Sequence, residues 1–175
     1  MTDSSAAWND IREAKKTYEQ KLRQTGRSTF EKFVPELFVE GVVGLCWTQY
    51  TPYFNDGEAC TFSRNTVFVG VTAGVGHELK NLGIDPSNDE MSHEYDVSEL
   101  DEEDPNAIWW YEDYRVKNLK KKLAVGSFPP SIAALQAALD FVLDCPEDVL
   151  EIAFGDHSKI SVTSKGITIE EVEHD

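Results

Sequence analysis

Apolar residues recur every three or four positions through the first forty residues, and this spacing predicts helices. The first helix carries one face formed by Trp8, Ile11, Lys15, Tyr18 and Leu22. Gly26 is a natural helix stop. Residues 28–31 (Ser-Thr-Phe-Glu) then match a capping box, which opens a second helix that ends at Gly41. The N-terminal part therefore predicts two consecutive helices.

The pattern changes to strands in the middle of the chain. Residues 42–49 form an apolar run, and Asn55-Asp56-Gly57 is a turn sequence typical of β-hairpins. A return strand is expected to run through Phe62. Residues 66–72 (Thr-Val-Phe-Val-Gly-Val-Thr) predict another strand. Three strands are therefore expected between positions 42 and 72.

Helical spacing and alternation both appear in the second half of the chain. Residues 109–123 predict a helix, 132–143 predict a strong helix after a Pro-Pro-Ser sequence, and 146–154 predict a short one. Residues 159–163 and 167–172 alternate around Ser-Lys-Gly and predict a closing hairpin. Together the elements predict an α+β fold, with an antiparallel sheet of about four or five strands packed against several helices.

Charge is distributed unevenly along the 175 residues, which suit a single domain over 1–175. The net charge is −16, yet residues 85–113 contain twelve Asp or Glu and no Lys or Arg. Residues 85–106 have few apolar groups, so we expect an acidic mobile loop inserted in the domain. Direct nucleic-acid binding is disfavoured, because phosphates require Lys and Arg. A protein with a basic surface is the more plausible partner.

The acidic run has two interpretations: a solvated loop, or carboxylates presented to a basic partner. In the second, four acidic residues steer the partner and the adjacent aromatic residues anchor it, since Trp and Tyr are preferred interface anchors. Three consecutive rings cannot all face one core, so we expect at least one to be exposed or to cover the loop. These candidate interaction residues are Asp101, Glu102, Glu103, Asp104, Trp109, Trp110 and Tyr111.

The aromatic segment 47–62 supports an alternative function, the sequestration of a nucleotide or another small ligand. Aromatic faces can stack on a base, and polar neighbours can orient it. The competing interpretation is that half of the rings belong to the core of a sheet. The candidate ligand contacts are Trp47, Gln49, Tyr50, Tyr53, Asp56 and Arg64.

The same segment, with its core Trp-Thr-Gln-Tyr-Thr-Pro-Tyr-Phe-Asn-Asp-Gly-Glu, resembles a pattern in uncharacterised bacteriophage proteins. Residues 154–157 (Phe-Gly-Asp-His), followed by a hairpin and an acidic end, are also similar to that group. The resemblance implies a phage-encoded protein in the cytoplasm of an infected bacterium, with a role in host takeover or anti-defence. It implies no activity, so it provides no catalytic residue.

Enzymatic and metal chemistry receive little support from the residues. Asp156 and His157 could begin a nucleophile-activating set, but neighbours on a strand point to opposite faces, and a turn is the simpler interpretation. The four histidines lack zinc-ligand spacing, and neither a phosphate loop nor a dinucleotide fingerprint is present. We therefore expect no catalytic residue, no metal and no cofactor. The three cysteines are expected to be reduced and buried, and no apolar run is long enough to cross a membrane.

Overall fold

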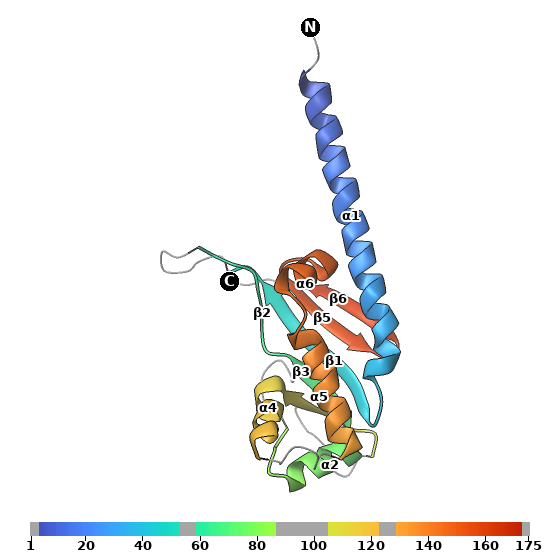
Figure 1. Cartoon of the computed structure of the whole chain (residues 1–175), viewed down its shortest axis with the longest axis vertical. Coiled ribbons are helices and arrows are strands. Elements are labelled where there is room, and N and C mark those ends of the chain that lie inside the picture. The colour runs from blue at the N-terminus through green and yellow to red at the C-terminus, as the bar shows by residue number, and fades with distance from the viewer. Residues whose placement is uncertain (1–3, 53–58, 87–104, 123–128, 173–175) are drawn as a thin grey trace.

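The sheet of this protein is antiparallel throughout and has six strands, which confirms the predicted α+β fold (Figure 1). The structure is a computed structural model and describes residues 4–52, 59–86, 105–122 and 129–172. The strands are β1 Val42–Tyr50, β2 Ser63–Arg64, β3 Phe68–Thr72, β4 Ile108–Glu112, β5 Ser158–Thr163 and β6 Gly166–Glu171.

The order of the strands is β4-β3-β1-β5-β6, and β2 pairs with the end of β1. The helices in the described part are α1 Ser4–Leu37, α2 Ala73–Asn81, α4 Asp113–Lys122, α5 Pro130–Leu143 and α6 Glu147–Phe154. In Figure 1, α5 lies across one face of the sheet, α6 lies at its upper end, and the base of α1 runs down the side of the body next to β6. Helices α5 and α6 and the β5–β6 hairpin confirm the predictions for the second half of the chain.

The central strand β1 is buried on both faces. Leu45 and Trp47 point into the main core beneath the helices, while Cys46 packs with Phe68 and Trp110 in a small cluster on the other face. A residue in the middle of a sheet has neighbours on both sides, so a nearly continuous apolar run is the expected sequence for this strand.

The N-terminal segment is one helix, so the predicted stop at Gly26 is wrong. Gly26 faces α6, where an added Cβ would come within 2.7 Å of the Cβ of Ala153. The side chain of Arg27 also donates a hydrogen bond of 3.0 Å to the carbonyl of Ala153. Glycine is thus required at position 26 by a close helix–helix contact and not by the end of a helix.

The segment 109–111 is a strand, so the predicted start of a helix at Trp109 is wrong. Each of its three residues pairs with β3, and the chain becomes helical only at Asp113. Aromatic residues favour strands because they pack well on a pleated surface. The rings at 109 and 111 face the helices, whereas the ring at 110 faces the other side of the sheet.

The segment after β3 is the helix α2, which the three glycines at 74, 76 and 83 had obscured in the sequence. At Gly76, an added Cβ would lie 2.4 Å from the indole of Trp109. The helix therefore lies against the flat face of this ring, and glycine permits that close approach despite its low helix propensity.

The predicted hairpin after β1 is only partly supported. The return strand was expected to end at Phe62, but β2 begins at Ser63 and pairs Arg64 with Gln49. The turn at 55–57 and the core of the acidic loop, residues 87–104, lie outside the described residues.

Candidate functional site

The aromatic segment of β1 is committed to the interior. Trp47 and Gln49 are fully buried on the helix-covered face. The indole nitrogen of Trp47 donates to Oε1 of Gln49 at 3.0 Å, and the Gln49 amide donates to the carbonyls of Leu150 and Gly155. These hydrogen bonds join β1 to α6, so neither side chain is available to a ligand in this structure.

The remaining candidate ligand contacts are dispersed. Arg64 donates to the carbonyls of Val142 and Leu143 at 2.6 and 3.4 Å, where it satisfies the C-terminal end of α5. Tyr50 stacks on His157 with 6.4 Å between the ring centroids. Tyr53 and Asp56 lie outside the described residues. The described part therefore does not bring these candidates together in a ligand pocket.

The candidate interface anchors are also buried. Trp109 and Tyr111 have no exposed surface and Trp110 is only 6% exposed, so none of the three rings is exposed. The alternative expectation, that one of them covers the acidic loop, involves residues 87–104, which lie outside the described residues. A β-strand with both faces covered buries consecutive side chains in opposite directions. The steering residues 101–104 lie outside the described residues. These rings cannot contact a partner unless the fold opens.

An apolar groove lies instead on the outer surface, between α1, α5 and α6. Its volume is about 540 Å³, and it is lined by Thr29, Phe30, Phe33, Ala137, Asp140, Phe141, Asp144, Cys145 and Val149. Phe33 is 41% exposed and Val149 is 38% exposed, whereas Phe30 is buried. Large apolar side chains that remain exposed along a groove are typical of an interaction site.

The floor of the groove is rigidly supported from the core. Phe30 packs edge-on against Phe141 and Phe154, with centroid distances of 5.2 and 4.8 Å, and Phe154 in turn contacts Trp47. Phe33 packs on Phe141 at 5.3 Å. A chain of aromatic contacts thus connects the groove to the sheet, which fixes the floor in place.

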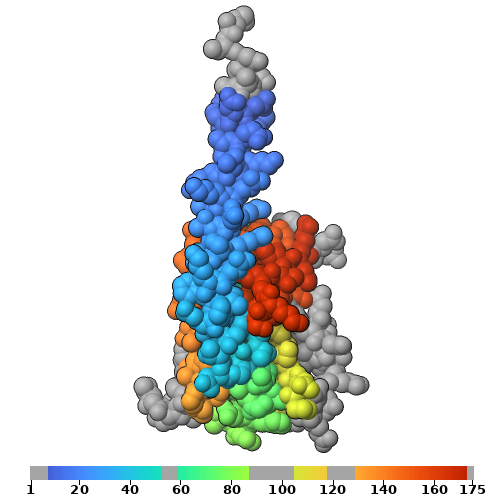
Figure 2. All heavy atoms as spheres, turned by 90° about the vertical axis from the view of Figure 1, so that its right-hand side faces the viewer, coloured from blue at the N-terminus to red at the C-terminus, as the bar shows by residue number. Residues whose placement is uncertain are grey.

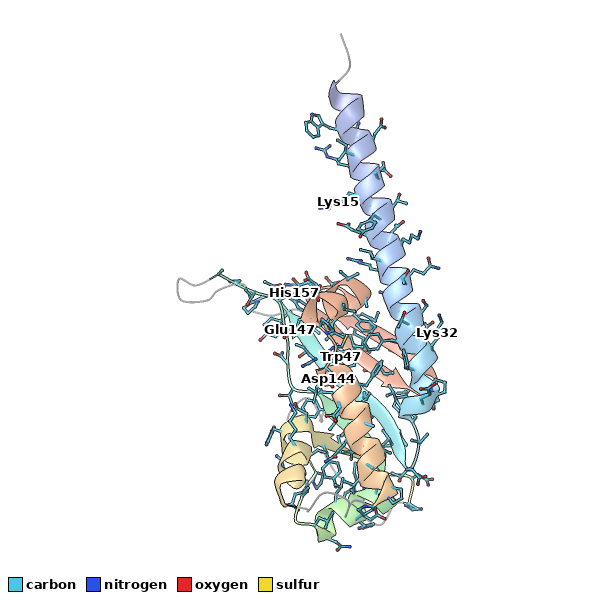
Figure 3. All side chains as sticks on the ribbon, viewed as in Figure 1. Lys15, Lys32, Trp47, Asp144, Glu147 and His157 are labelled. Carbon is cyan, nitrogen blue, oxygen red and sulfur yellow. The ribbon has the colours of Figure 1, made fainter. Side chains whose placement is uncertain are left out.

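The rim of the groove carries negative charge. Asp140 and Asp144 both line it, and Asp144 is exposed. Glu147 lies beyond Asp144 on the same surface of the body (Figure 3). Within the described residues, no Lys or Arg forms an ion pair with Asp144 or Glu147. The apolar floor and the acidic rim together fit a partner segment that is apolar on the side facing the groove and basic along its edges.

The second exposed feature is the N-terminal half of α1, here called the arm and defined as residues 4–25. Every residue from Trp8 to Lys21 is exposed, and Figure 2 shows the upper part of α1 standing clear of the body, whereas its lower part lies against it. Trp8 is 62% exposed, Ile11 58% and Tyr18 63%. The apolar face predicted from the sequence is therefore exposed at Trp8, Ile11 and Tyr18, whereas Leu22 is half-buried beside α6.

The pair Asp156-His157 forms a turn, as the sequence analysis had favoured. Oδ1 of Asp156 accepts hydrogen bonds from the amides of Thr51 and His157 at 2.7 and 2.8 Å. The hydroxyl of Ser158 donates to the carbonyls of Phe154 and Asp156. This hydroxyl is engaged by the backbone, so the arrangement resembles a structural turn and not an activated nucleophile.

The charge of Asp156 is expected to contribute to stability in a pH-dependent way. Burial raises the pKa of Asp156, but the hydrogen bonds from Thr51 and His157 outweigh it and lower this pKa from 3.8. The charged carboxyl of Asp156 therefore stabilises the folded state at pH values above its unfolded-state pKa. This stabilisation is lost as the pH falls through the lowered pKa of the folded state. Asp156→Asn should lower the free energy of unfolding by about 1 kcal/mol at pH 7, after allowance for solvent screening.

Urea unfolding of the wild type and Asp156→Asn at pH 7 and at pH 3 would measure this effect. The difference between the two proteins should be smaller at pH 3 than at pH 7, because the stabilisation by the charged carboxyl declines below its unfolded-state pKa. An equal difference at both pH values would mean that the charge of Asp156 has no stabilising role.

The cysteines are all free, with Cys46 buried, Cys145 half-buried and Cys60 exposed. The prediction of buried thiols is thus wrong for Cys60. Among the described residues, no group of three His, Cys, Asp or Glu side chains could hold a metal ion. The helices in that same part of the chain include none that is both long and apolar enough for a membrane span.

The groove was missed from the sequence although its signals were present. Phe33 and Val149 lie on different helices about 115 positions apart, and only the contact between α1 and α6 brings them to one surface. The exposed arm could have been recognised from the net positive charge of the first 27 residues, which have six Lys or Arg and four Asp or Glu. In a protein of charge −16, this basic character is shared with α4, which carries Arg115, Lys117 and Lys120–Lys122, and differs from most of the chain.

Comparison with known proteins adds no identification. A scan against protein-family models finds no match for this chain, and searches of curated proteins and of solved structures find none either. The resemblance to bacteriophage proteins stays a prediction from the sequence, and the geometry of the groove and the arm is the basis on which a function can be proposed.

Proposed function

We propose that this protein is a non-enzymatic binding protein that holds a basic amphipathic helix of a partner protein in the groove between α1, α5 and α6. The observation that supports this proposal most strongly is the exposed Phe33 and Val149 on the floor, beside Asp140 and Asp144 on the rim. An amphipathic helix inserts apolar residues at positions i, i+3, i+4 and i+7 into such a groove.

The charge of the whole protein favours the same partner. The first 27 residues contribute a charge of +2 to the total of −16, so the remainder of the chain carries −18. A field of this sign attracts a basic protein from a distance and accelerates its encounter, while the acidic rim selects against acidic helices. The groove then supplies apolar contact, which the field alone cannot provide.

The bacteriophage resemblance adds a setting to this proposal. The partner would be a host protein in the cytoplasm of an infected bacterium, such as a defence factor or a factor that handles nucleic acid. The partner needs a basic surface, and an amphipathic helix with one apolar face and one basic face provides it. The groove thus replaces Trp109, Trp110 and Tyr111 as the anchoring surface.

The test is a comparison of captured host proteins. The wild type and a double variant, Asp140→Lys with Asp144→Lys, would be immobilised and exposed to bacterial lysate, with mass spectrometry of the retained proteins. We expect at least one basic protein to be retained by the wild type and lost with the variant. A matched control is Glu170→Lys with Glu171→Lys on strand β6, which changes the charge equally at exposed sites away from the groove.

Identical sets of captured proteins for the wild type and the groove variant would contradict the proposal. Loss of the same protein with the β6 control would show that net charge, and not the groove, is responsible.

A further inference from the structure

The arm is a helix that lacks the packing on which helices normally depend. The residues from Trp8 to Lys21 are all exposed, and in Figure 1 the N-terminal end of α1 extends beyond the sheet and the other helices. Nearer the body, Glu19 and Leu22 border a hollow that they share with α6. Isolated helices shorter than about 12–15 residues are marginal in water, and most helical stability in proteins comes from packing of an apolar face. The only ion pair along this part in the described structure is Lys15 with Glu19, which is well exposed and contributes little.

The arm carries the spacing of a helix–helix seam. Apolar or uncharged residues recur at alternating intervals of three and four, a pattern that Lys15 interrupts once; the full series of positions is Trp8, Ile11, Lys15, Tyr18, Leu22, Thr25 and Thr29. Such a repeat keeps one face turned toward a neighbouring helix over its whole length. The stripe is therefore suited to a partner helix that runs alongside the arm.

The stripe leads directly into the groove. Thr29, its last member, and Phe33, one turn further, line the groove from the α1 side. A helix that lies along the arm would therefore continue into the groove without leaving the surface of α1. The two exposed apolar features of the molecule form one continuous surface.

Charge identifies a helix that fits this surface. The arm, residues 4–25, contains five Lys or Arg and three Asp or Glu, while the groove rim presents Asp140 and Asp144. Figure 3 shows Lys15 on the arm, clear of the body, and Asp144 on the body. The arm thus has the chemistry that the groove requires, apolar on one face and basic elsewhere. It cannot reach its own groove, because both are built on the same straight helix.

We propose that two copies of this chain associate through antiparallel arms, with Trp8 of each copy inserted in the groove of the other. This inference rests on the proposed function of the groove and names its first occupant. Trp8 and Phe33 are about 37 Å apart along α1 at 1.5 Å per residue, so antiparallel arms of this length place each Trp8 beside the partner's Phe33. The arrangement is two-fold symmetric and closes on itself, as most stable homodimers do.

This dimer also has a regulatory consequence for the proposed function. The groove is occupied in the dimer, so a host helix must displace the arm before it can bind. In the dimer, the arm of the other copy would cover the apolar floor of the groove and shield it from water and nonspecific contacts. A host helix with higher affinity for the groove would then replace the arm.

Sedimentation equilibrium of the full chain tests the association. The wild type should show twice the monomer mass of 19.7 kDa at micromolar concentration. Trp8→Asp and Asp144→Lys should each raise the dissociation constant by tenfold or more. The matched control for Trp8→Asp is Asn9→Asp, which adds the same negative charge at the next residue of the arm, outside the stripe. This control should leave the dimer intact.

A second measurement locates the contact through Cys145, which lines the groove. In a Cys60→Ser background, Ile11→Cys should be linked by a short bis-maleimide to Cys145 of the other copy, with a covalent dimer as product. Positions 11 and 29 of one chain are about 27 Å apart along the helix, so a short reagent cannot make this link within one copy. Glu13→Cys, on the opposite face of the arm, should give no such link.

A monomeric wild type at all concentrations, without the 11–145 link, would overturn the proposed dimer. If a synthetic basic amphipathic helix still bound the groove in that case, the function proposed for the groove would stand and only its occupant would be wrong. A dimer that survives both Trp8→Asp and Asp144→Lys would equally refute the arm-in-groove arrangement.

Discussion

Gln49→Ala is expected to lower the free energy of unfolding by roughly 3–5 kcal/mol, among the largest effects of a single substitution in this protein. The fully buried Gln49 side chain satisfies the indole N–H of Trp47 and the carbonyls of Leu150 and Gly155. Alanine leaves all three groups without these partners, and each unsatisfied buried group costs about 1–3 kcal/mol. Chemical denaturation monitored by tryptophan fluorescence would measure the loss.

Gln136→Ala is a suitable control for that experiment. Gln136 is only 9% exposed, yet its amide nitrogen donates no hydrogen bond within the described structure. The same substitution there removes little hydrogen bonding and should cost about 1 kcal/mol or less. Equal losses at positions 49 and 136 would show that the network joining β1 to α6 is not a major source of stability.

Trp109→Ala is expected to cost about 3–5 kcal/mol, because it removes a large buried side chain from the main core. The ring of Trp109 is completely buried, lies against Gly76 of α2 and contacts His77 edge-on at 4.9 Å. Loss of the ring leaves a cavity that α2 cannot easily fill. Thermal or urea unfolding measures this effect, with Ile108→Ala as the neighbouring control, since Ile108 is 46% exposed.

The same variant separates two roles for the aromatic strand. An interface anchor would lose partner binding while it retained stability, whereas a core residue loses stability. A stable Trp109→Ala protein with impaired binding would restore the interface that the sequence alone had suggested and would contradict the buried position of this ring.

Local sequence patterns predicted most of the elements because they depend on neighbouring residues. The β5–β6 hairpin follows from alternation around a turn, and α5 follows from apolar spacing after two prolines. The errors occurred where long-range contacts override local preference. Gly26 lies inside a helix because the close approach of Ala153 favours glycine at a position where glycine locally predicts a helix end. Residues 109–111 form a strand although short apolar runs fit helical and strand patterns equally well.

The candidate site was harder to predict for the same reason. Aromatic composition points to residues that could bind a partner, but the burial of each ring depends on which elements cover it. Trp47 and Trp109 are core residues, whereas Phe33 and Trp8 are among the exposed apolar residues. Only the acidic character of the protein was transferable from sequence to surface, since charged side chains remain in solvent in most folds.

The most direct test of the proposed function is titration of the protein with a labelled synthetic helix that has Leu at every third or fourth position and Lys elsewhere. The Trp8→Asp variant is the appropriate protein, because its groove should be open. We predict saturable binding whose affinity decreases with added salt. When Asp140→Lys and Asp144→Lys are added to the same variant, the affinity should decrease tenfold or more, which corresponds to about 1.4 kcal/mol. Equally tight binding of a matched helix with Glu in place of Lys, or binding unaffected by the two rim substitutions, would contradict the account.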